Sequence, residues 1–159
     1  MDVIAMKPEI VKGDIIKQDT EVIVNAWNRN IIPWWLLWPH GVSGSIKKHG
    51  GTGAFRELAR HGPIPLGGAV LTGAGALPFK GIIHVAGINM FWIATRYSIT
   101  NSTANAMKIV DEKGFRSVAF PLIGAGAGGY SRELVLEMMT GELAKVETPA
   151  MVRIVIFDS

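Results

Sequence analysis

Short apolar runs rich in β-branched residues alternate along this chain with longer segments whose apolar residues recur at helical spacing. Runs of the first kind are typical of buried strands, and segments of the second kind are typical of amphipathic helices. The pattern predicts six strands, at Glu9–Lys12, Val22–Asn25, Ala69–Thr72, Gly81–Val85, Ser117–Phe120 and Val152–Phe157. It predicts helices at Thr52–His61, Ser98–Lys113 and Ser131–Ala144.

Several predicted strands are apolar on both faces, which is typical of a mainly parallel sheet covered by helices on both sides. The alternation of strands and helices predicts an α/β protein built as an α/β/α sandwich. The length of 159 residues, without a visible repeat or linker, fits a single domain over residues 1–159. The last predicted helix offers a core-facing stripe of Leu134, Leu136, Met138, Met139 and Leu143.

Composition narrows the class of protein. Hydrophobic residues make up 48% and charged residues 18% of the chain, as in a compact folded domain. The absence of cysteine excludes disulfides, a thiolate nucleophile and thiolate metal sites. The net charge of +3 favours an anionic ligand, but the basic residues are too scattered for a nucleic-acid surface. Neither a signal peptide nor an apolar run of membrane-spanning length is recognisable, so a soluble cytoplasmic protein is expected.

Two apolar strands each run into a stretch of small residues that precedes a helix. The first leads from Val22–Asn28 to the loop Gly41–Ile46, and the second continues into Ile123–Tyr130. Glycine-rich loops leave backbone N–H groups uncovered, and the following helix adds its dipole, so each stretch predicts an anion-binding cradle. Two such cradles in one small domain indicate a ligand with adjacent phosphates, such as a diphosphate.

The second stretch also has a different interpretation. Gly124, Gly126 and Gly129 match the GxGxxG fingerprint, and Asp158 ends the next strand, where a ribose hydroxyl is held in nicotinamide and flavin enzymes. No further sheet follows to complete a second mononucleotide-binding half, which speaks against that site. A tight turn with close packing of strand and helix is the third interpretation.

Several polar residues are candidates for ligand contacts. Asp14, in Gly13-Asp14-Ile15, follows a strand and is placed either to accept from an exocyclic amine or simply to form a turn. Asn25 and Asn28 both offer donors and an acceptor, which can hold ribose hydroxyls or pin the loop backbone. Pinning competes with ligand binding for Asn25, and Asn28, which lies further out, is the better ligand contact. His84, inside a strand, is interpreted as a core residue with satisfied hydrogen bonds.

Basic and aromatic residues near the first cradle receive separate interpretations. Lys47 and Lys48 are expected on a solvated helix face, and His40 and His49 lack the spacing of metal ligands, so no metal site is predicted. The run Trp34–Trp38, bracketed by prolines, is interpreted as a flap over the binding cleft or as an oligomer interface, with a membrane wedge or a satellite core as further options.

Taken in order, these motifs resemble those of the macrodomain family. The resemblance is carried by Gly13-Asp14-Ile15, Val24-Asn25-Ala26-Trp27-Asn28, Gly41-Val42-Ser43-Gly44-Ser45-Ile46, the strand from Gly67 to Gly73, Ile83-His84, and the stretch from Phe120 to Tyr130. It implies a three-layer α/β/α sandwich around a mixed, mostly parallel sheet. It also implies that ADP-ribose, free or attached to a protein or small molecule, binds across the carboxyl ends of the strands, with no further cofactor.

The resemblance assigns a role to each motif. Asp14 would take the adenine amine, Ile15 would offer a backbone contact, and Phe157 matches an aromatic beside the adenine. The two glycine stretches would clamp the diphosphate, and Asn28 would contact the distal ribose with support from Asn25. The residues expected to bind ligand are Asp14, Ile15, Asn25, Asn28, Gly41, Val42, Ser43, Gly44, Gly124, Ala125, Gly126, Ala127, Gly128, Gly129, Tyr130 and Phe157.

The sequence departs from the family pattern at positions that bear on catalysis. Members that remove ADP-ribose from proteins carry an aspartate where this chain has Ser43, and a neutral hydroxyl is no general base at neutral pH without a partner. Gly128 stands where an aromatic is frequent, and Trp27 replaces a small alanine. We therefore expect the tryptophan run to supply the missing stacking surface and to reshape the distal ribose pocket.

Three functions remain open from sequence. An ADP-ribosyl hydrolase would use Asn28 to orient a water, with Ser43 in the catalytic position and His40 as a proton carrier. A reader would bind ADP-ribose without turnover. A nicotinamide oxidoreductase would use Gly124–Gly129 and Asp158.

Overall fold

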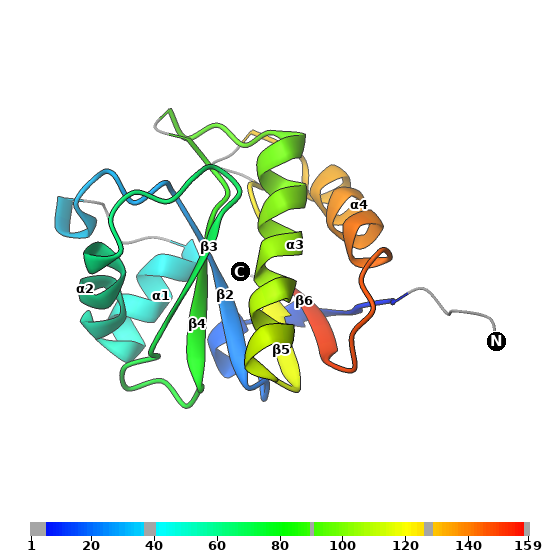
Figure 1. Cartoon of the computed structure of the whole chain (residues 1–159), viewed down its shortest axis with the longest axis horizontal. Helices are drawn as coiled ribbons and strands as arrows, with labels where there is room; N and C mark the ends of the chain where they lie inside the picture. Colours follow the sequence, from blue (N-terminus) through cyan, green and yellow to red (C-terminus); the bar gives the residue numbers. More distant parts are fainter. Residues whose placement is uncertain (1–5, 37–40, 90, 126–128, 158–159) are drawn as a thin grey trace.

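The computed structural model describes residues 6–36, 41–89, 91–125 and 129–157 (Figure 1). Its strands are β1 (Glu9–Gly13), β2 (Val22–Trp27), β3 (Ala69–Thr72), β4 (Gly81–Ala86), β5 (Ser117–Phe120) and β6 (Met151–Phe157). Its helices are α1 (Gly41–Gly50), α2 (Gly53–Arg60), α3 (Arg96–Lys113) and α4 (Arg132–Leu143), with short 3₁₀ turns η1 (Ile15–Lys17) and η2 (Trp34–Leu36). Every predicted strand is present, with ends that differ by at most two residues from the prediction.

The six strands form one sheet in the order β1-β6-β5-β2-β4-β3. All neighbours run parallel except β3, which is antiparallel to β4 at one edge. The predicted mixed, mostly parallel sheet is therefore confirmed. At the other edge β1 pairs with β6, which joins strands from opposite ends of the described chain.

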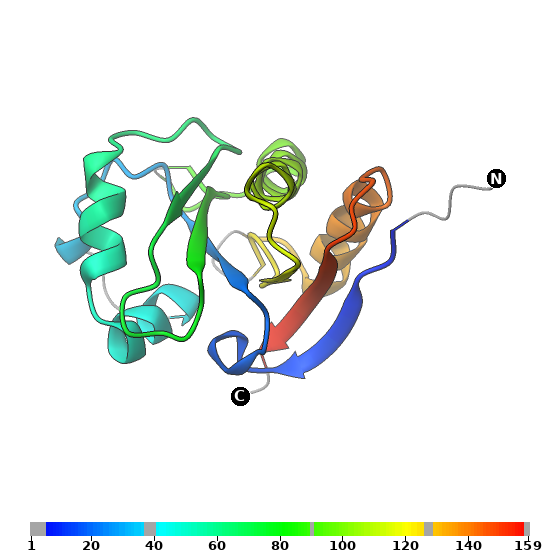
Figure 2. The same cartoon turned by 60° about the horizontal axis from the view of Figure 1, so that its bottom comes forward.

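Helices cover both faces of the sheet and complete three layers. In Figures 1 and 2, α1 and α2 lie on one side of the sheet, and α3 and α4 lie on the other. Side chains of β2 alternate between two hydrophobic clusters: Val22 and Val24 pack toward α3 and α4, whereas Ile23 and Trp27 pack toward α1 and α2. The predicted α/β/α sandwich is confirmed.

Local sequence explains where the helices begin and end. Thr95 and Ser98 form a capping box at the start of α3, and Gly114 ends this helix in a left-handed conformation. The predicted stripe of α4 is partly wrong, because Val135 is fully buried together with the two methionines and Leu143. Leu134 and Leu136, which were placed on the stripe, are only half-buried.

The stretch Gly41–Ile46 was predicted as a loop before a short helix, and this is wrong. Helix α1 begins at Gly41 itself and runs to Gly50. Its three glycines lower the helix propensity of this segment, but Ile46 is fully buried and holds the helix on the sheet.

No helix within the described ranges combines the length and the apolar character needed to cross a membrane.

Candidate functional site

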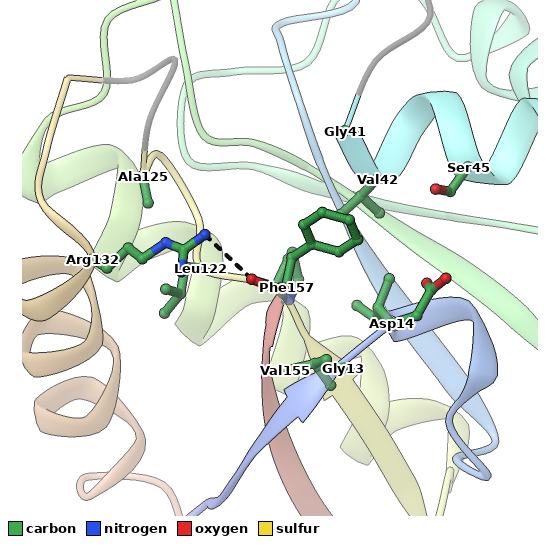
Figure 3. Close-up of a pocket in the computed structure, with 12 residues that line it drawn as sticks. Gly13, Asp14, Gly41, Val42, Ser45, Leu122, Ala125, Arg132, Val155 and Phe157 are labelled. Atoms are coloured by element: carbon green, nitrogen blue, oxygen red, sulfur yellow. Dashed lines mark hydrogen bonds between the residues drawn. The ribbon is translucent and has the colours of Figure 1, made fainter. Parts of the chain in front are cut away.

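A cavity of about 380 Å³ opens at the carboxyl ends of the parallel strands. Two neighbouring strands explain its position, because the chain leaves β2 toward α1 on one face and leaves β5 toward α4 on the other. Ligands of open α/β sheets bind in the crevice at such a switch point. The lining residues are Gly13, Asp14, Ile15, Gly41, Val42, Ser45, Pro121, Leu122, Ala125, Arg132, Val155 and Phe157 (Figure 3).

The first turn of α1 forms one wall of the cavity. Gly41, Val42 and Ser45 line it, so the N–H groups at the helix start, which have no partner within the helix, lie at the cavity. The basic residues of α1 fall in its last turn, where they complement the helix dipole. The predicted anion cradle is thus a helix N-terminus rather than a loop. His40 and the preceding three residues lie outside the described residues.

The glycine stretch after β5 forms the opposing wall. Pro121, Leu122 and Ala125 line the cavity, and Ala125 bridges to Tyr130, which is half-buried against the α3–α4 cluster. Gly124 has a φ of +80°, and a Cβ on it would lie 2.6 Å from the Cβ of Ala94, so only glycine fits there. Both stretches therefore contribute to the lining of one cavity, the first through Gly41 and Val42 and the second through Ala125. Gly126, Ala127 and Gly128 lie outside the described residues.

Asp14 stands at the end of β1. Its Oδ1 accepts a hydrogen bond of 3.1 Å from the backbone N–H of Ile16 and so caps η1. The turn interpretation is therefore correct, and the same half-buried carboxylate also lines the cavity. Ile15 is buried in the cluster below α1, so a ligand would meet its backbone rather than its side chain.

An aromatic ring and an arginine complete this end of the cavity. Phe157 at the end of β6 is 58% exposed, and Figure 3 draws its ring between Asp14 and Arg132. The Arg132 guanidinium donates a hydrogen bond of 3.3 Å to the carbonyl oxygen of Phe157. Sequence reasoning missed Arg132. A signal was present, since a cation in the first turn of a helix opposes the helix dipole and needs another reason to be there.

The two asparagines of the β2 motif are both buried. Asn25 is fully buried, accepts from the Ser43 hydroxyl at 3.0 Å, and has its Nδ2 3.0 Å from His84 Nδ1. Asn28 is 4% exposed, and its Oδ1 accepts from the backbone N–H of Asn30 at 2.7 Å. Asn25 therefore pins the first turn of α1 to the sheet, as the alternative interpretation held. Neither asparagine lines the 380 Å³ cavity, and the ligand role of Asn28 stays a prediction.

The remaining predicted contacts lie beside the cavity rather than in its lining. Ser43 and Gly44 belong to the first turn of α1, between residues that do line it. Gly124, with a φ of +80°, directly precedes Ala125 of the opposing wall, and Gly129 has a φ of +93° just before Tyr130. Of the residues singled out by sequence, the structure brings Asp14, Ile15, Gly41, Val42, Ala125 and Phe157 together in the cavity lining.

His84 is a core residue, as predicted. It is fully buried, its ring nitrogens contact Asn25 and Thr72, and burial lowers its pKa to about 3. The imidazole is therefore neutral and is no acid–base group at neutral pH. Within the described residues, no group of three His, Asp or Glu side chains is arranged to hold a metal ion.

The expectation of a solvated helix face is wrong for Lys47, although Lys48 is exposed. The Lys47 ammonium lies 4.8 Å from the ring centre of Phe55, 5.4 Å from that of Trp27 and 5.9 Å from that of Trp34. It also donates to the Trp34 carbonyl oxygen at 3.3 Å, and burial lowers its pKa. This aromatic cage ties η2 to α1.

The cage also locates the described part of the tryptophan run. Trp34 packs on Phe55, whereas Trp35 and Leu36 are mostly exposed, and none of the three lines the cavity. The flap prediction therefore fails for Trp34–Leu36, and Leu37 and Trp38 lie outside the described residues. Trp27 is buried, with its ring centre 5.1 Å from that of Phe55, and it is not among the residues that line the cavity.

Comparison with known proteins agrees with this geometry. The family model of the Macro domain matches residues 24–139. An O-acetyl-ADP-ribose deacetylase 1 of Pantoea vagans is 33% identical, with 96% of this chain and 92% of that protein covered. A macro domain-containing protein of Caldanaerobacter subterraneus is 36% identical over 80% of this chain and 73% of its own length.

A solved structure shows the same fold. The chain superposes on a mutant macrodomain of Oceanobacillus iheyensis with ADPR at a TM-score of 0.81 and 29% identity, covering 94% of this chain and 84% of the other. The order of the motifs, the three-layer fold and the matched family model lead to one conclusion: this chain belongs to the macro domain family.

Proposed function

We propose that this protein binds ADP-ribose, free or attached to a protein or small molecule, in the cavity between α1 and the loop after β5. The observation that carries the proposal is that the start of α1 and Ala125 of the glycine stretch, which belong to the two stretches expected to bind an anion, line one cavity. The volume of about 380 Å³ falls within the range of small-molecule sites.

Charge in the cavity supports a ligand with a diphosphate in the middle. Backbone N–H groups at a helix start attract phosphate oxygens, and the Arg132 side chain adds a cation at the rim. At the β1–β6 end, Asp14 lines the cavity, and under the proposal its carboxylate accepts from the adenine amine. The exposed Phe157 ring offers a surface on which the base stacks.

A second candidate function is hydrolysis at the distal ribose. The observation in its favour is the Pantoea vagans relative, whose name states that it deacetylates O-acetyl-ADP-ribose. Ser43 hydrogen-bonds to the Asn25 amide, and within the described ranges no basic side chain hydrogen-bonds to it that would activate it as a nucleophile or base. Hydrolysis would instead need a water oriented by Asn28 and by the diphosphate of the ligand.

Calorimetry with ADP-ribose, ADP and NAD tests the binding proposal. We expect ADP-ribose and ADP to bind and NAD to bind no more tightly than ADP-ribose. A clear preference for NAD would instead favour the nicotinamide enzyme, and no binding of any of the three would refute the proposal.

A deacetylation assay with O-acetyl-ADP-ribose separates hydrolase from reader. Release of acetate that is lost in Asn28→Ala supports hydrolysis. Tight binding of ADP-ribose without release supports a reader.

A further inference from the structure

A line of four side chains connects the first turn of α1 to the edge strand β3 through the interior of the protein. Ser43 Oγ donates to Asn25 Oδ1 at 3.0 Å, and Asn25 Nδ2 lies 3.0 Å from His84 Nδ1. His84 Nε2 lies 2.8 Å from Thr72 Oγ1, which donates to the Gly73 carbonyl oxygen at 2.9 Å. We refer to Ser43, Asn25, His84 and Thr72 as the relay.

The sheet register places the relay. Asn25 and His84 are direct partners in the parallel pair β2–β4, so their side chains leave the same face. That face packs against α2, where the ring of Phe55 meets His84 edge-on at 5.7 Å. Asn25, His84 and Thr72 are at most 3% exposed, so protein groups rather than water decide the direction of each hydrogen bond.

The direction of every hydrogen bond in the relay follows from Thr72, the residue at its end. A carbonyl oxygen only accepts, so the Thr72 hydroxyl gives its hydrogen to Gly73 and its oxygen accepts from His84 Nε2. A neutral imidazole carries one N–H, so Nδ1 must accept from the Asn25 amide nitrogen. The Asn25 oxygen therefore faces α1 and takes the only hydrogen of the Ser43 hydroxyl.

The burial of His84 supports this single direction. Its pKa of about 3 keeps the ring neutral at physiological pH, so a doubly protonated imidazole does not interrupt the order. As a result Ser43 has no hydrogen left to donate, and its oxygen is available to a further partner only as an acceptor.

We propose that the relay fixes Ser43 as a hydrogen-bond acceptor for a hydroxyl of the distal ribose or for the water beside it, with Asn25, His84 and Thr72 as positioning residues. The part that concerns the ligand rests on the proposed function. Under this proposal Ser43 keeps the accepting polarity of the aspartate that it replaces, but without the negative charge. It orients a donor, and it does not act as a base.

The histidine tautomer tests the direction of the relay without any ligand. Long-range ¹H–¹⁵N spectra of labelled protein distinguish a proton on Nε2 from one on Nδ1, and His84→Gln assigns the signal among the four histidines. We expect the proton on Nε2 in the unmodified protein and in Ser43→Ala. A proton on Nδ1 in the unmodified protein would overturn the proposal.

Ser43→Asp tests whether the direction is transmitted through the relay. A carboxylate only accepts, so the Asn25 amide must turn its nitrogen toward position 43 and its oxygen toward His84. We expect the His84 proton to move to Nδ1 in this variant. An unchanged tautomer in folded Ser43→Asp would show that the four side chains do not act as a unit.

A change remote from the cavity tests the effect on binding. Thr72→Val removes the group that receives the Nε2 proton, so both directions of the relay become populated and Ser43 presents a hydrogen in part of the molecules. We expect ADP-ribose to bind about twofold to tenfold more weakly. ADP, which lacks the distal ribose, should bind as before, and Thr72→Ser should restore the affinity for ADP-ribose.

The outcomes separate the two proposals. Equal weakening of ADP-ribose and ADP in Thr72→Val, or no weakening of either, would overturn the positioning role. If the unmodified protein fails to bind ADP-ribose, the proposed function fails, whereas the tautomer of His84 still decides whether the relay has the inferred direction.

Discussion

The carboxylate of Asp14 offers the sharpest test of how the base would be recognised. One of its oxygens accepts from the N–H of Ile16 and caps η1, while the side chain lines the cavity. Asp14→Asn separates the two roles. The amide oxygen can keep the cap, because asparagine caps a helix about as well as aspartate does. The amide nitrogen would then take the place of the second carboxylate oxygen and present a donor to the adenine amine.

The expected loss follows from this geometry. A hydrogen bond to a charged acceptor contributes about 1.5–3 kcal/mol. In the variant this bond is lost and the amide N–H group faces the adenine amine, another donor, so ADP-ribose binding should weaken about tenfold to hundredfold. The free energy of unfolding should change by less than about 0.5 kcal/mol, since the cap remains.

Calorimetry with two ligands provides the assay. IDP-ribose carries a carbonyl oxygen where ADP-ribose carries the amine, so it should bind the unmodified protein more weakly. In Asp14→Asn this preference should vanish or reverse, because the new amide donates to the carbonyl. If the variant weakens both ligands by the same factor, or leaves ADP-ribose binding unchanged, then Asp14 does not read the base.

Three further predictions concern stability and the walls of the cavity. Gly124→Ala should destabilise the protein by about 1–3 kcal/mol and weaken ADP binding, because φ of Gly124 is +80° and a Cβ has no space there. Gly141→Ala, at a position on α4 with open space around it, should instead stabilise the protein by about 0.5–1 kcal/mol, and urea unfolding of both variants makes the comparison. The pKa of His84 falls from 6.5 to about 3 on folding, so the unfolded chain binds more protons between these values and stability is lost as pH falls through that window. His84→Gln should therefore reduce the slope of the free energy of unfolding against pH by about 1.4 kcal/mol per pH unit between pH 4 and 6. An unchanged slope would contradict the burial of a neutral ring. Lys47→Met should cost about 1 kcal/mol and alter tryptophan fluorescence, while Lys48→Met should do neither, and equal effects would rule out the aromatic cage.

The strands and their burial between two layers of helices could be predicted because a two-sided apolar pattern is a local property of the sequence. Helix α1 could not, since its three glycines lower helix propensity and its stability comes from packing of Ile46 on the sheet. The same reason explains the error for Lys47, whose neighbours Trp27 and Phe55 are distant in sequence.

The site was predictable to a similar degree. Asp14 and the two glycine stretches follow strands, and the ends of parallel strands meet at one edge, so their convergence is a consequence of the fold. The relay depends on the register of β2 against β4 and on the antiparallel edge strand β3, which local patterns do not specify. Arg132 enters the cavity only because α4 starts beside the end of β6.

The pairing of β1 with β6 has a consequence for how the protein matures on the ribosome. β6 is the only neighbour of β1 in the described sheet, and Glu9 of β1 pairs with Arg153 of β6. We expect a nascent chain that has released only the segments before β6 to assemble first the two cavity walls that are proposed to hold the phosphates. The proposed pocket for the base includes Asp14 and Phe157 and would close last, so a stalled chain would hold an anion without discriminating between nucleobases.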